Sequence, residues 1–247
     1  GLRMKLLCLG DSLTFGSAGY SYIRFLDPRI SAVNKGKNGD STRGAAKRLE
    51  RYLRDPRYFG ISTYVVFIGI NDILGPFLST LSPLWKLVMK PRCACKRCIT
   101  EDSVFAAEYE KILDLLAEHG KKTVLVGLPF IQVKGFPTEK ILARNAIIEG
   151  LAKKRGLPYA DAFSLQQGAL KNPGEAYSWG ICWGKRVLDI AVMALFPGRK
   201  DALSRARRLS LTVDGVHFNS LSAKLLAGEI SQKVLLPAED APARPGR

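Results

Sequence analysis

The chain has 247 residues, 47% of them hydrophobic, and a formal net charge of +16 at pH 7. This length and composition allow one α/β domain with a sizeable core, and the excess of cations predicts attraction to polyanions or anionic membranes without specifying the fold. No stretch approaches the ~18–20 apolar residues of a membrane span, which excludes a helical membrane protein and predicts a soluble or peripheral one.

The first predicted element is a buried strand at 4–9. Its apolar run resembles a signal peptide superficially, but it is short, contains Lys5 and is followed by no small-residue cleavage site. Further β-rich apolar runs predict strands at 30–34, 63–68, 123–127 and 158–160. Helical patterns between and after these runs predict helices over 41–53, 103–119, 138–155 and 220–236. This alternation is typical of an α/β fold in which helices cover a parallel sheet.

Two segments interrupt the alternation, at about 74–102 (the first insert) and 165–211 (the second insert). Each stands where a connection normally takes only a few residues. Both are basic: 83–98 contains five Lys or Arg and no acidic residue, and 185–208 contains seven against two Asp. We expect a single domain over 1–236 that carries these inserts, followed by a Pro-rich, disordered tail at 237–247.

The stretch GDSLT at 10–14 follows the first strand directly. Ligands of α/β folds bind at strand ends, although Asp and Ser also favour ordinary turns. A serine nucleophile needs a base, and the chain has two histidines. His119 stands in the last turn of a predicted helix, where it would cap carbonyls. His217 belongs to the loop sequence DGVH, in which Asp214 could fix its tautomer while the other ring nitrogen faces the serine.

Two further strand ends offer hydrogen-bond donors for an oxyanion. Gly39 follows the second strand and could present its backbone N–H without obstruction by a side chain. Asn71, in the sequence GIND after the third strand, offers its side-chain amide. Each residue taken singly also has an ordinary explanation in a turn.

In this order and spacing, the blocks resemble the SGNH (GDSL) hydrolases, a family of serine esterases and lipases. The residues that fall on the family's four name-giving positions and its triad acid are Ser12, Gly39, Asn71, His217 and Asp214. The resemblance runs over 10–219 and leaves the two inserts uncovered. It implies a flavodoxin-like three-layer α/β/α sandwich with a central parallel sheet of about five strands, and hydrolysis of esters or thioesters.

The resemblance also implies residue roles. Ser12 would attack the acyl carbon, His217 would accept its proton, and Asp214 would stabilise the imidazolium. The N–H groups of Ser12 and Gly39 and the Asn71 amide would form the oxyanion hole, with no cofactor and no metal required. The chain contains neither the G-x-S-x-G elbow of the larger α/β-hydrolase fold nor a phosphate-binding glycine loop.

Several substrates are compatible with this chemistry. The expected partner is a small-molecule or lipid ester, with lysophospholipids, acetylated sugars, thioesters and simple esters all open. The alternative function is a catalytically silent basic module that binds lipid headgroups or nucleic acid. The complete set of five site residues argues against a silent module, and the lack of interleaved aromatic and basic residues outside the inserts disfavours nucleic acid.

The second insert has its own pattern. Residues 187–196 are apolar apart from Asp189 and lie between two pairs of cations, Lys185 with Arg186 and Arg199 with Lys200. This composition is typical of an interfacial helix in contact with an anionic membrane surface, with Trp179 and Trp183 as anchors. The alternatives are a lid or a helix packed over the site, with a solvated basic edge.

The five cysteines do not have the spread-out spacing of a disulfide framework, so we expect a reducing, cytoplasmic setting. Cys93, Cys95 and Cys98 could bind zinc with Cys182 as the fourth ligand, although their spacing matches zinc knuckles only in part. Surface thiols among cations could instead be redox-sensitive. Cys8 is expected in the core.

Overall fold

A computed structural model describes residues 3–180 and 183–236. Its sheet is all-parallel, with the strand order β2-β1-β3-β4-β5. The strands are β1 (Met4–Gly10), β2 (Ile30–Gly36), β3 (Thr63–Phe67), β4 (Lys122–Val126) and β5 (Tyr159–Ala160). β3 is buried along its whole length, because helices cover both faces of a parallel sheet. The predicted five-stranded parallel sheet is therefore confirmed.

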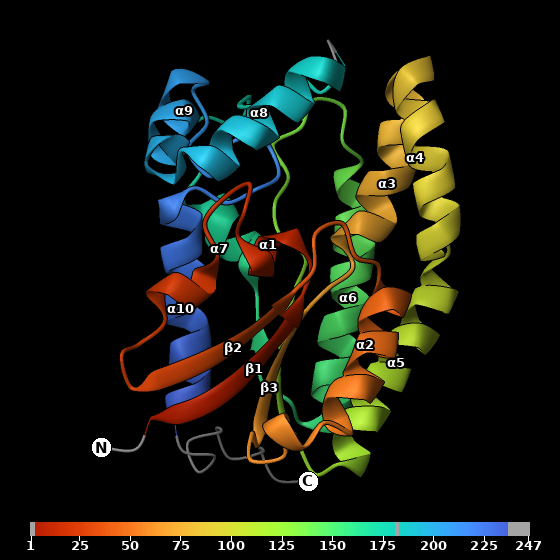
Figure 1. The fold of residues 1–247 in the computed structure, drawn as a ribbon, viewed down its shortest axis with the longest axis vertical. Helices are drawn as coiled ribbons and strands as arrows, with labels where there is room; N and C mark the ends of the chain where they lie inside the picture. Colours follow the sequence, from red (N-terminus) through yellow and green to blue (C-terminus); the bar gives the residue numbers. More distant parts are fainter. Residues whose placement is uncertain (1–2, 181–182, 237–247) are drawn as a thin grey trace, which may run out of the picture.

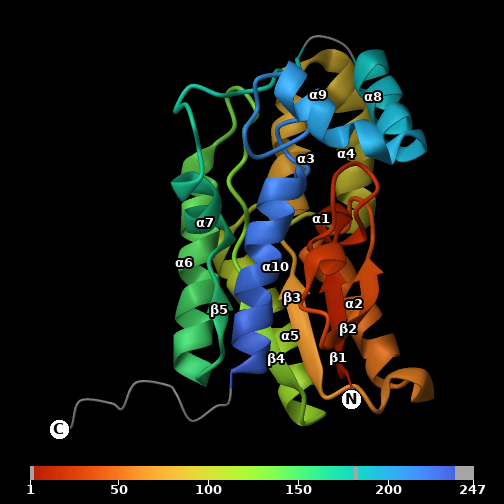
Figure 2. The same ribbon diagram turned by 90° about the vertical axis from the view of Figure 1, so that its left-hand side faces the viewer.

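Helices cover the sheet on both sides (Figures 1 and 2). One layer consists of α2 (Thr42–Leu53), α5 (Asp102–Glu118) and α6 (Thr138–Arg155), which pack side by side. The other layer consists of α10 (Ser220–Leu235), α7 (Ala162–Gly168) and the 3-10 turn η1 (Tyr22–Phe25). The three-layer α/β/α sandwich is therefore confirmed, with element ends within two residues of those predicted.

Local sequence explains where the covering helices begin and end. The Ser41 hydroxyl accepts a hydrogen bond from the N–H of Gly44 at the start of α2, and the Asn219 side chain does the same for Ser222 at the start of α10. Helix α6 ends at Gly156, which adopts the left-handed conformation that glycine tolerates best.

Both inserts are largely helical and lie beyond the carboxyl ends of the strands (Figure 1). The first insert contains most of α3 (Ile70–Leu81) and all of α4 (Pro83–Lys96). The second contains α8 (Trp183–Leu195), a 3-10 turn η3 (Pro197–Arg199) and α9 (Lys200–Ala206). None of the helices described at 3–180 and 183–236 combines the length and apolar character that a bilayer crossing requires.

Two tryptophans join the inserts. The indole N–H of Trp85 on α4 donates to the backbone oxygen of Trp179 at 2.9 Å, and the two rings stack with centroids 5.8 Å apart. Trp179 is only 5% exposed, so its predicted role as a membrane anchor is wrong. The side chain of Trp183 and the predicted disordered tail at 237–247 fall outside the part of the chain that the structure describes.

Candidate active site

The residues singled out at the strand ends come together in space. Ser12 opens the short helix α1 (Ser12–Phe15) after β1, Gly39 lies between β2 and α2, and Asn71 lies in the first turn of α3. The loop before α10 brings His217 to them, and all four residues line one cavity. The carboxyl ends of parallel strands meet at one edge of the sheet, which is why such distant segments converge.

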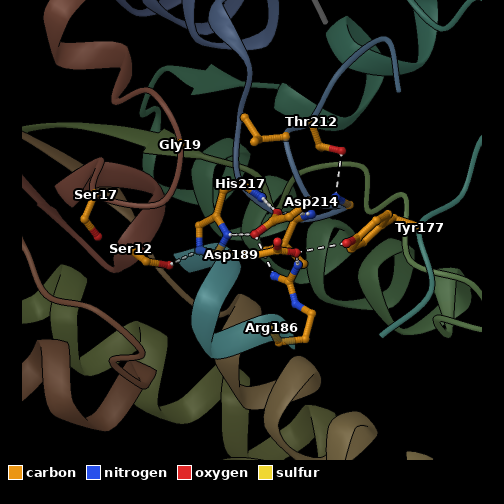
Figure 3. A network of polar contacts seen from close by, with 12 residues as sticks. Ser12, Ser17, Gly19, Tyr177, Arg186, Asp189, Thr212, Asp214 and His217 are labelled. Carbon is orange, nitrogen blue, oxygen red and sulfur yellow. Dashed lines mark hydrogen bonds and ion pairs between the residues drawn. The ribbon is translucent and has the colours of Figure 1, made fainter. Parts of the chain in front are cut away.

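A chain of hydrogen bonds links Ser12, His217 and Asp214 (Figure 3). His217 Nε2 lies 3.1 Å from the Ser12 hydroxyl oxygen, and His217 Nδ1 lies 2.7 Å from Asp214 Oδ2. The other carboxylate oxygen of Asp214 accepts the backbone N–H groups of Val216 and His217, at 3.0 and 2.8 Å. The arrangement lets the imidazole take a proton from the serine while the carboxylate fixes its tautomer.

Asp214 is completely buried, yet the site favours its ionised form. Burial by itself would raise the pKa of this carboxyl. The charge of His217, its hydrogen bonds and the Arg186 guanidinium outweigh burial and hold the pKa well below its usual range. The carboxylate therefore carries its negative charge at neutral pH.

The GDSLT stretch itself forms a capped turn. The carboxylate of Asp11 accepts the N–H of Leu13 at 2.9 Å and so caps α1, which leaves Ser12 at the start of the helix. Burial raises the pKa of the Asp11 carboxyl to about 7, against the opposing effects of the Leu13 hydrogen bond and the His217 charge. Asp11 therefore contributes a local hydrogen bond to the shape of the turn.

A second buried aspartate fastens the neighbouring segments. Asp72 accepts the N–H and the hydroxyl of Thr42 at 3.0 and 2.6 Å, and the N–H of Ile99 at 2.9 Å. It therefore ties the start of α2 and the end of the first insert to the strand end that carries Asn71.

The groups proposed to bind the oxyanion each have an N–H that no protein acceptor occupies in the described ranges. The Asn71 amide gives one N–H to the backbone oxygen of Asp40 at 3.0 Å, which leaves its second hydrogen for a ligand. Within the described ranges, the backbone N–H groups of Ser12 and Gly39 donate to no protein acceptor. Gly39 has φ +66°, a conformation that favours glycine, and a Cβ there would lie 2.9 Å from Lys96 Nζ.

Arg186 is a site residue that sequence reasoning missed. Both alternatives for the second insert, a membrane contact and a packed helix with a solvated basic edge, left its cations exposed, whereas Arg186 is only 3% exposed. Its guanidinium donates to Asp214 at 2.9 Å (Figure 3). The same group lies 4.0 Å from the centre of the Trp179 ring. Nothing local in the sequence signals a contact between residues 28 positions apart in different segments.

Polar contacts hold the loop that carries the histidine. The Thr212 hydroxyl donates to the side chain of Gln132 at 2.8 Å and accepts the N–H of Gly215 at 3.0 Å. The backbone N–H of Gln132 donates to the Gly215 oxygen at 2.7 Å. A Cβ on Gly19 would lie 2.8 Å from the Cβ of His217, so this close approach of the two segments requires glycine.

The other histidine has the structural position expected for it. His119 lies at the end of α5, and its Nδ1 contacts the Leu115 oxygen at 2.8 Å. Cys8 is fully buried on β1, as predicted.

The cysteine cluster does not gather as a metal site. Among residues 3–180 and 183–236, no three His, Cys, Asp or Glu side chains are placed to hold an ion. Cys93 and Cys98 line the cavity, whereas Cys95 is exposed. Burial raises the pKa of the Cys98 thiol, which opposes the thiolate form that redox sensing needs. Cys182, the fourth predicted ligand, lies outside the described residues.

The cavity at the site has a volume of about 340 Å³, within the ~300–1,000 Å³ typical of ligand sites. It extends from Ser12 between the two inserts. Its apolar wall comes from α3, α4 and α8 and consists of Leu74, Leu78, Val88, Met89, Val187 and Ile190. The charged side chains that line it are three cations, Arg92, Lys96 and Arg186, and its described lining contains no carboxylate.

Comparison with known proteins is consistent with this geometry. The sequence model of the GDSL-like lipase/acylhydrolase family matches residues 8–221. The lipase/acylhydrolase of Enterococcus faecalis is similar over 94% of this chain and 95% of its own, at 17% identity and a TM-score of 0.56. A lipolytic G-D-S-L family member from Veillonella parvula is similar over 92% and 96%, at 14% identity and a TM-score of 0.57.

A further solved structure, the acetyl xylan esterase AlAXEase, is similar over 94% of this chain and 100% of its own, at 15% identity and a TM-score of 0.57. At such identities these structures establish a shared fold. No curated protein sequence matches the chain.

Proposed function

Since the chain belongs to the GDSL-like lipase/acylhydrolase family, we propose that it hydrolyses carboxylic esters through an acyl-enzyme formed on Ser12. The observation that carries the proposal is the hydrogen-bond chain from Ser12 through His217 to Asp214. Such a chain activates a hydroxyl that is otherwise a weak nucleophile.

The reaction has two halves. In the first, the Ser12 hydroxyl oxygen attacks the acyl carbon, its proton passes to His217 Nε2, and the collapse of the tetrahedral intermediate releases the alcohol, which takes that proton. In the second, water attacks the acyl-enzyme with His217 again as base, which frees the acid and restores the serine. During both halves, the N–H groups of Ser12 and Gly39 and the Asn71 amide hold the oxyanion.

The cavity favours an ester with an apolar part. Its wall of leucine, valine, isoleucine and methionine side chains suits an acyl chain, and the hydrophobic effect contributes about 0.8 kcal/mol for each buried methylene. We therefore expect turnover to improve from acetyl to longer acyl groups until the chain fills the space between α4 and α8.

A fluorophosphonate probe tests the mechanism directly. The probe should attach to the peptide that contains Ser12, and Ser12→Ala purified in the same way should neither react nor hydrolyse p-nitrophenyl butyrate. A catalytically silent binding module on the same fold is the alternative function. A wild-type protein that neither labels nor turns over any ester of a chain-length panel would favour that alternative.

We further propose that the ends of α4 and α8 contact an anionic lipid surface. Large apolar side chains point into solvent there: Leu87 on α4 is 72% exposed, and Leu188 and Leu195 on α8 are 63% and 73% exposed. The two helices lie at the same end of the molecule in both views (Figures 1 and 2) and flank the same cavity. Large apolar side chains exposed at one end of a molecule are typical of an interaction surface.

Charge favours lipid over a second copy of the chain as the occupant. Exposed cations accompany the apolar side chains, on α4 and around α8: Lys86, Lys90, Lys185 and Arg199. α4 has no acidic residue, and the one on α8, Asp189, is paired inward with Arg186 and Arg207. Two copies would bring cations against cations, whereas anionic headgroups complement them.

A further inference from the structure

Each insert sends one cation into the candidate active site. Arg186, from α8, reaches the triad acid, and Lys96, from α4, reaches the peptide that precedes Gly39. We propose that these two side chains are positioning residues of the reaction, Arg186 for the Asp214–His217 pair and Lys96 for the oxyanion hole. The proposal rests on the proposed esterase function.

Arg186 shares one oxygen with the histidine. Its Nη2 donates to Asp214 Oδ2 at 2.9 Å, and His217 Nδ1 contacts the same oxygen at 2.7 Å. Since Oδ1 is occupied by two backbone N–H groups, every strong acceptor position of the carboxylate has a donor. The guanidinium is held in place by the face of Trp179 and by Asp189, whose carboxylate lies 3.3 Å from Nη1.

Several other charged or titratable groups face this cluster. Asp189 also pairs with Arg207 at 2.9 Å and accepts the Tyr177 hydroxyl at 3.0 Å. On the opposite side, Asp11 interacts with the charge of His217. The two arginines and the carboxylates of Asp189 and Asp214 therefore form a largely buried set without net charge, so Arg186 acts on the histidine as a partly screened cation.

A cation at this position affects the protonation of His217, the proposed catalytic base. Protonated His217 and Arg186 would both be positive and would both bind Asp214 Oδ2, so the guanidinium disfavours the imidazolium. Arg186 therefore favours the neutral imidazole, the form that can accept the serine proton, over the imidazolium.

Lys96 acts on the other half of the site. Its ammonium donates to the backbone oxygens of Asn38, at 3.2 Å, and Gly39, at 2.5 Å. The Asn38 carbonyl and the Gly39 N–H belong to one peptide unit, so a cation on the oxygen polarises the N–H proposed to hold the oxyanion. The same contacts fix the left-handed turn at Gly39 in the orientation that the site needs.

The test for Arg186 is the pH profile of kcat/KM on neutral, soluble p-nitrophenyl butyrate. Arg186→Gln should move the midpoint of the acid limb upward by about one pH unit. Arg186→Lys, which keeps a cation, should restore most of the shift. The matched control is Arg207→Gln, which removes a cation from the same cluster without touching Asp214 and should move the midpoint by much less.

An unmoved acid limb in Arg186→Gln would overturn the role of Arg186, and so would equal shifts in Arg186→Gln and Arg207→Gln. If Arg186→Gln does not fold, Arg186→Met replaces it, because an apolar side chain of similar length can fill the space of a buried charge.

The test for Lys96 is to measure kcat and KM separately on the same substrate. Lys96→Met should lower kcat about 10-fold, a fraction of the ~10²–10³ lost when a donor is removed, with KM nearly unchanged and the acid limb unmoved. Lys47→Met removes an exposed cation from α2, the helix that follows Gly39, and should leave kcat unaltered. A normal kcat in Lys96→Met, or an equal loss in Lys47→Met, would overturn this half of the proposal.

Ser12→Ala separates the two levels of inference. If it retains turnover, the esterase mechanism fails. If it abolishes turnover while the Arg186 and Lys96 variants behave like wild type, the mechanism stands and the positioning roles fail.

Discussion

Neutralising Asp11 should stabilise the protein at alkaline pH. Burial raises the pKa of this carboxyl to about 7, whereas an aspartate in an unfolded chain titrates near ~3.9. The native state therefore binds the proton more tightly than the unfolded state does. Stability from this group is full below about pH 4 and is lost as the pH rises toward 7, where the buried carboxylate must carry its charge.

The magnitude follows from the difference between the pKa of Asp11 in the native state and in the unfolded state. Each pKa unit of that difference corresponds to about 1.4 kcal/mol. Ionisation of the buried Asp11 therefore lowers the free energy of unfolding by about 1.5 kcal/mol at pH 5 and by about 4 kcal/mol at pH 8. Asp11→Asn removes the titration and keeps an oxygen for the Leu13 N–H. For a chain of this size the extra gain of about 2.5 kcal/mol at pH 8 corresponds to roughly 5–10 °C in Tm.

The assay is thermal unfolding of both proteins at pH 5 and pH 8, followed by circular dichroism. The difference in Tm between variant and wild type should be larger at pH 8 by that amount. Asp55→Asn serves as the control, because Asp55 is paired with Arg57 at the surface and its pKa is lowered, away from the tested range. An Asp11→Asn effect of the same size at both pH values would refute the reasoning.

Three further outcomes are expected. Asp214→Asn should lower kcat by about 10⁴-fold without unfolding the protein, because the amide favours the wrong imidazole tautomer; a loss under 10-fold would argue against the triad. Asn71→Ala should lower kcat by about 10²- to 10³-fold, measured against a control at an exposed asparagine, Asn172→Ala, and equal effects would argue against an oxyanion role. Sedimentation with anionic vesicles should show binding at 0.01 M salt that largely disappears at 0.15 M and weakens in Leu188→Ser/Leu195→Ser. Binding at neither salt concentration, or equal binding by the variant, would exclude the proposed lipid contact.

Sequence patterns were sufficient to predict the strands and the covering helices of this protein. The five strands and the four covering helices follow from apolar runs, helical periodicity and caps such as Ser41 and Asn219, all of which are local signals. Ser12, Gly39, Asn71 and His217 could be selected because each stands directly at a strand end or before a helix. In a parallel sheet those ends converge, so position along the chain already implied proximity.

Only the tertiary structure shows that both inserts reach the candidate active site. Residues 187–196 have the composition of a solvated or membrane-bound helix, yet the neighbouring Arg186 is buried against Asp214, and Trp179 is stacked on Trp85 of the other insert. The local sequence around a charged or aromatic side chain does not indicate whether that side chain faces water or a buried partner. Which of these happens depends on packing between segments far apart in the chain, and the free energy of that packing leaves no local pattern.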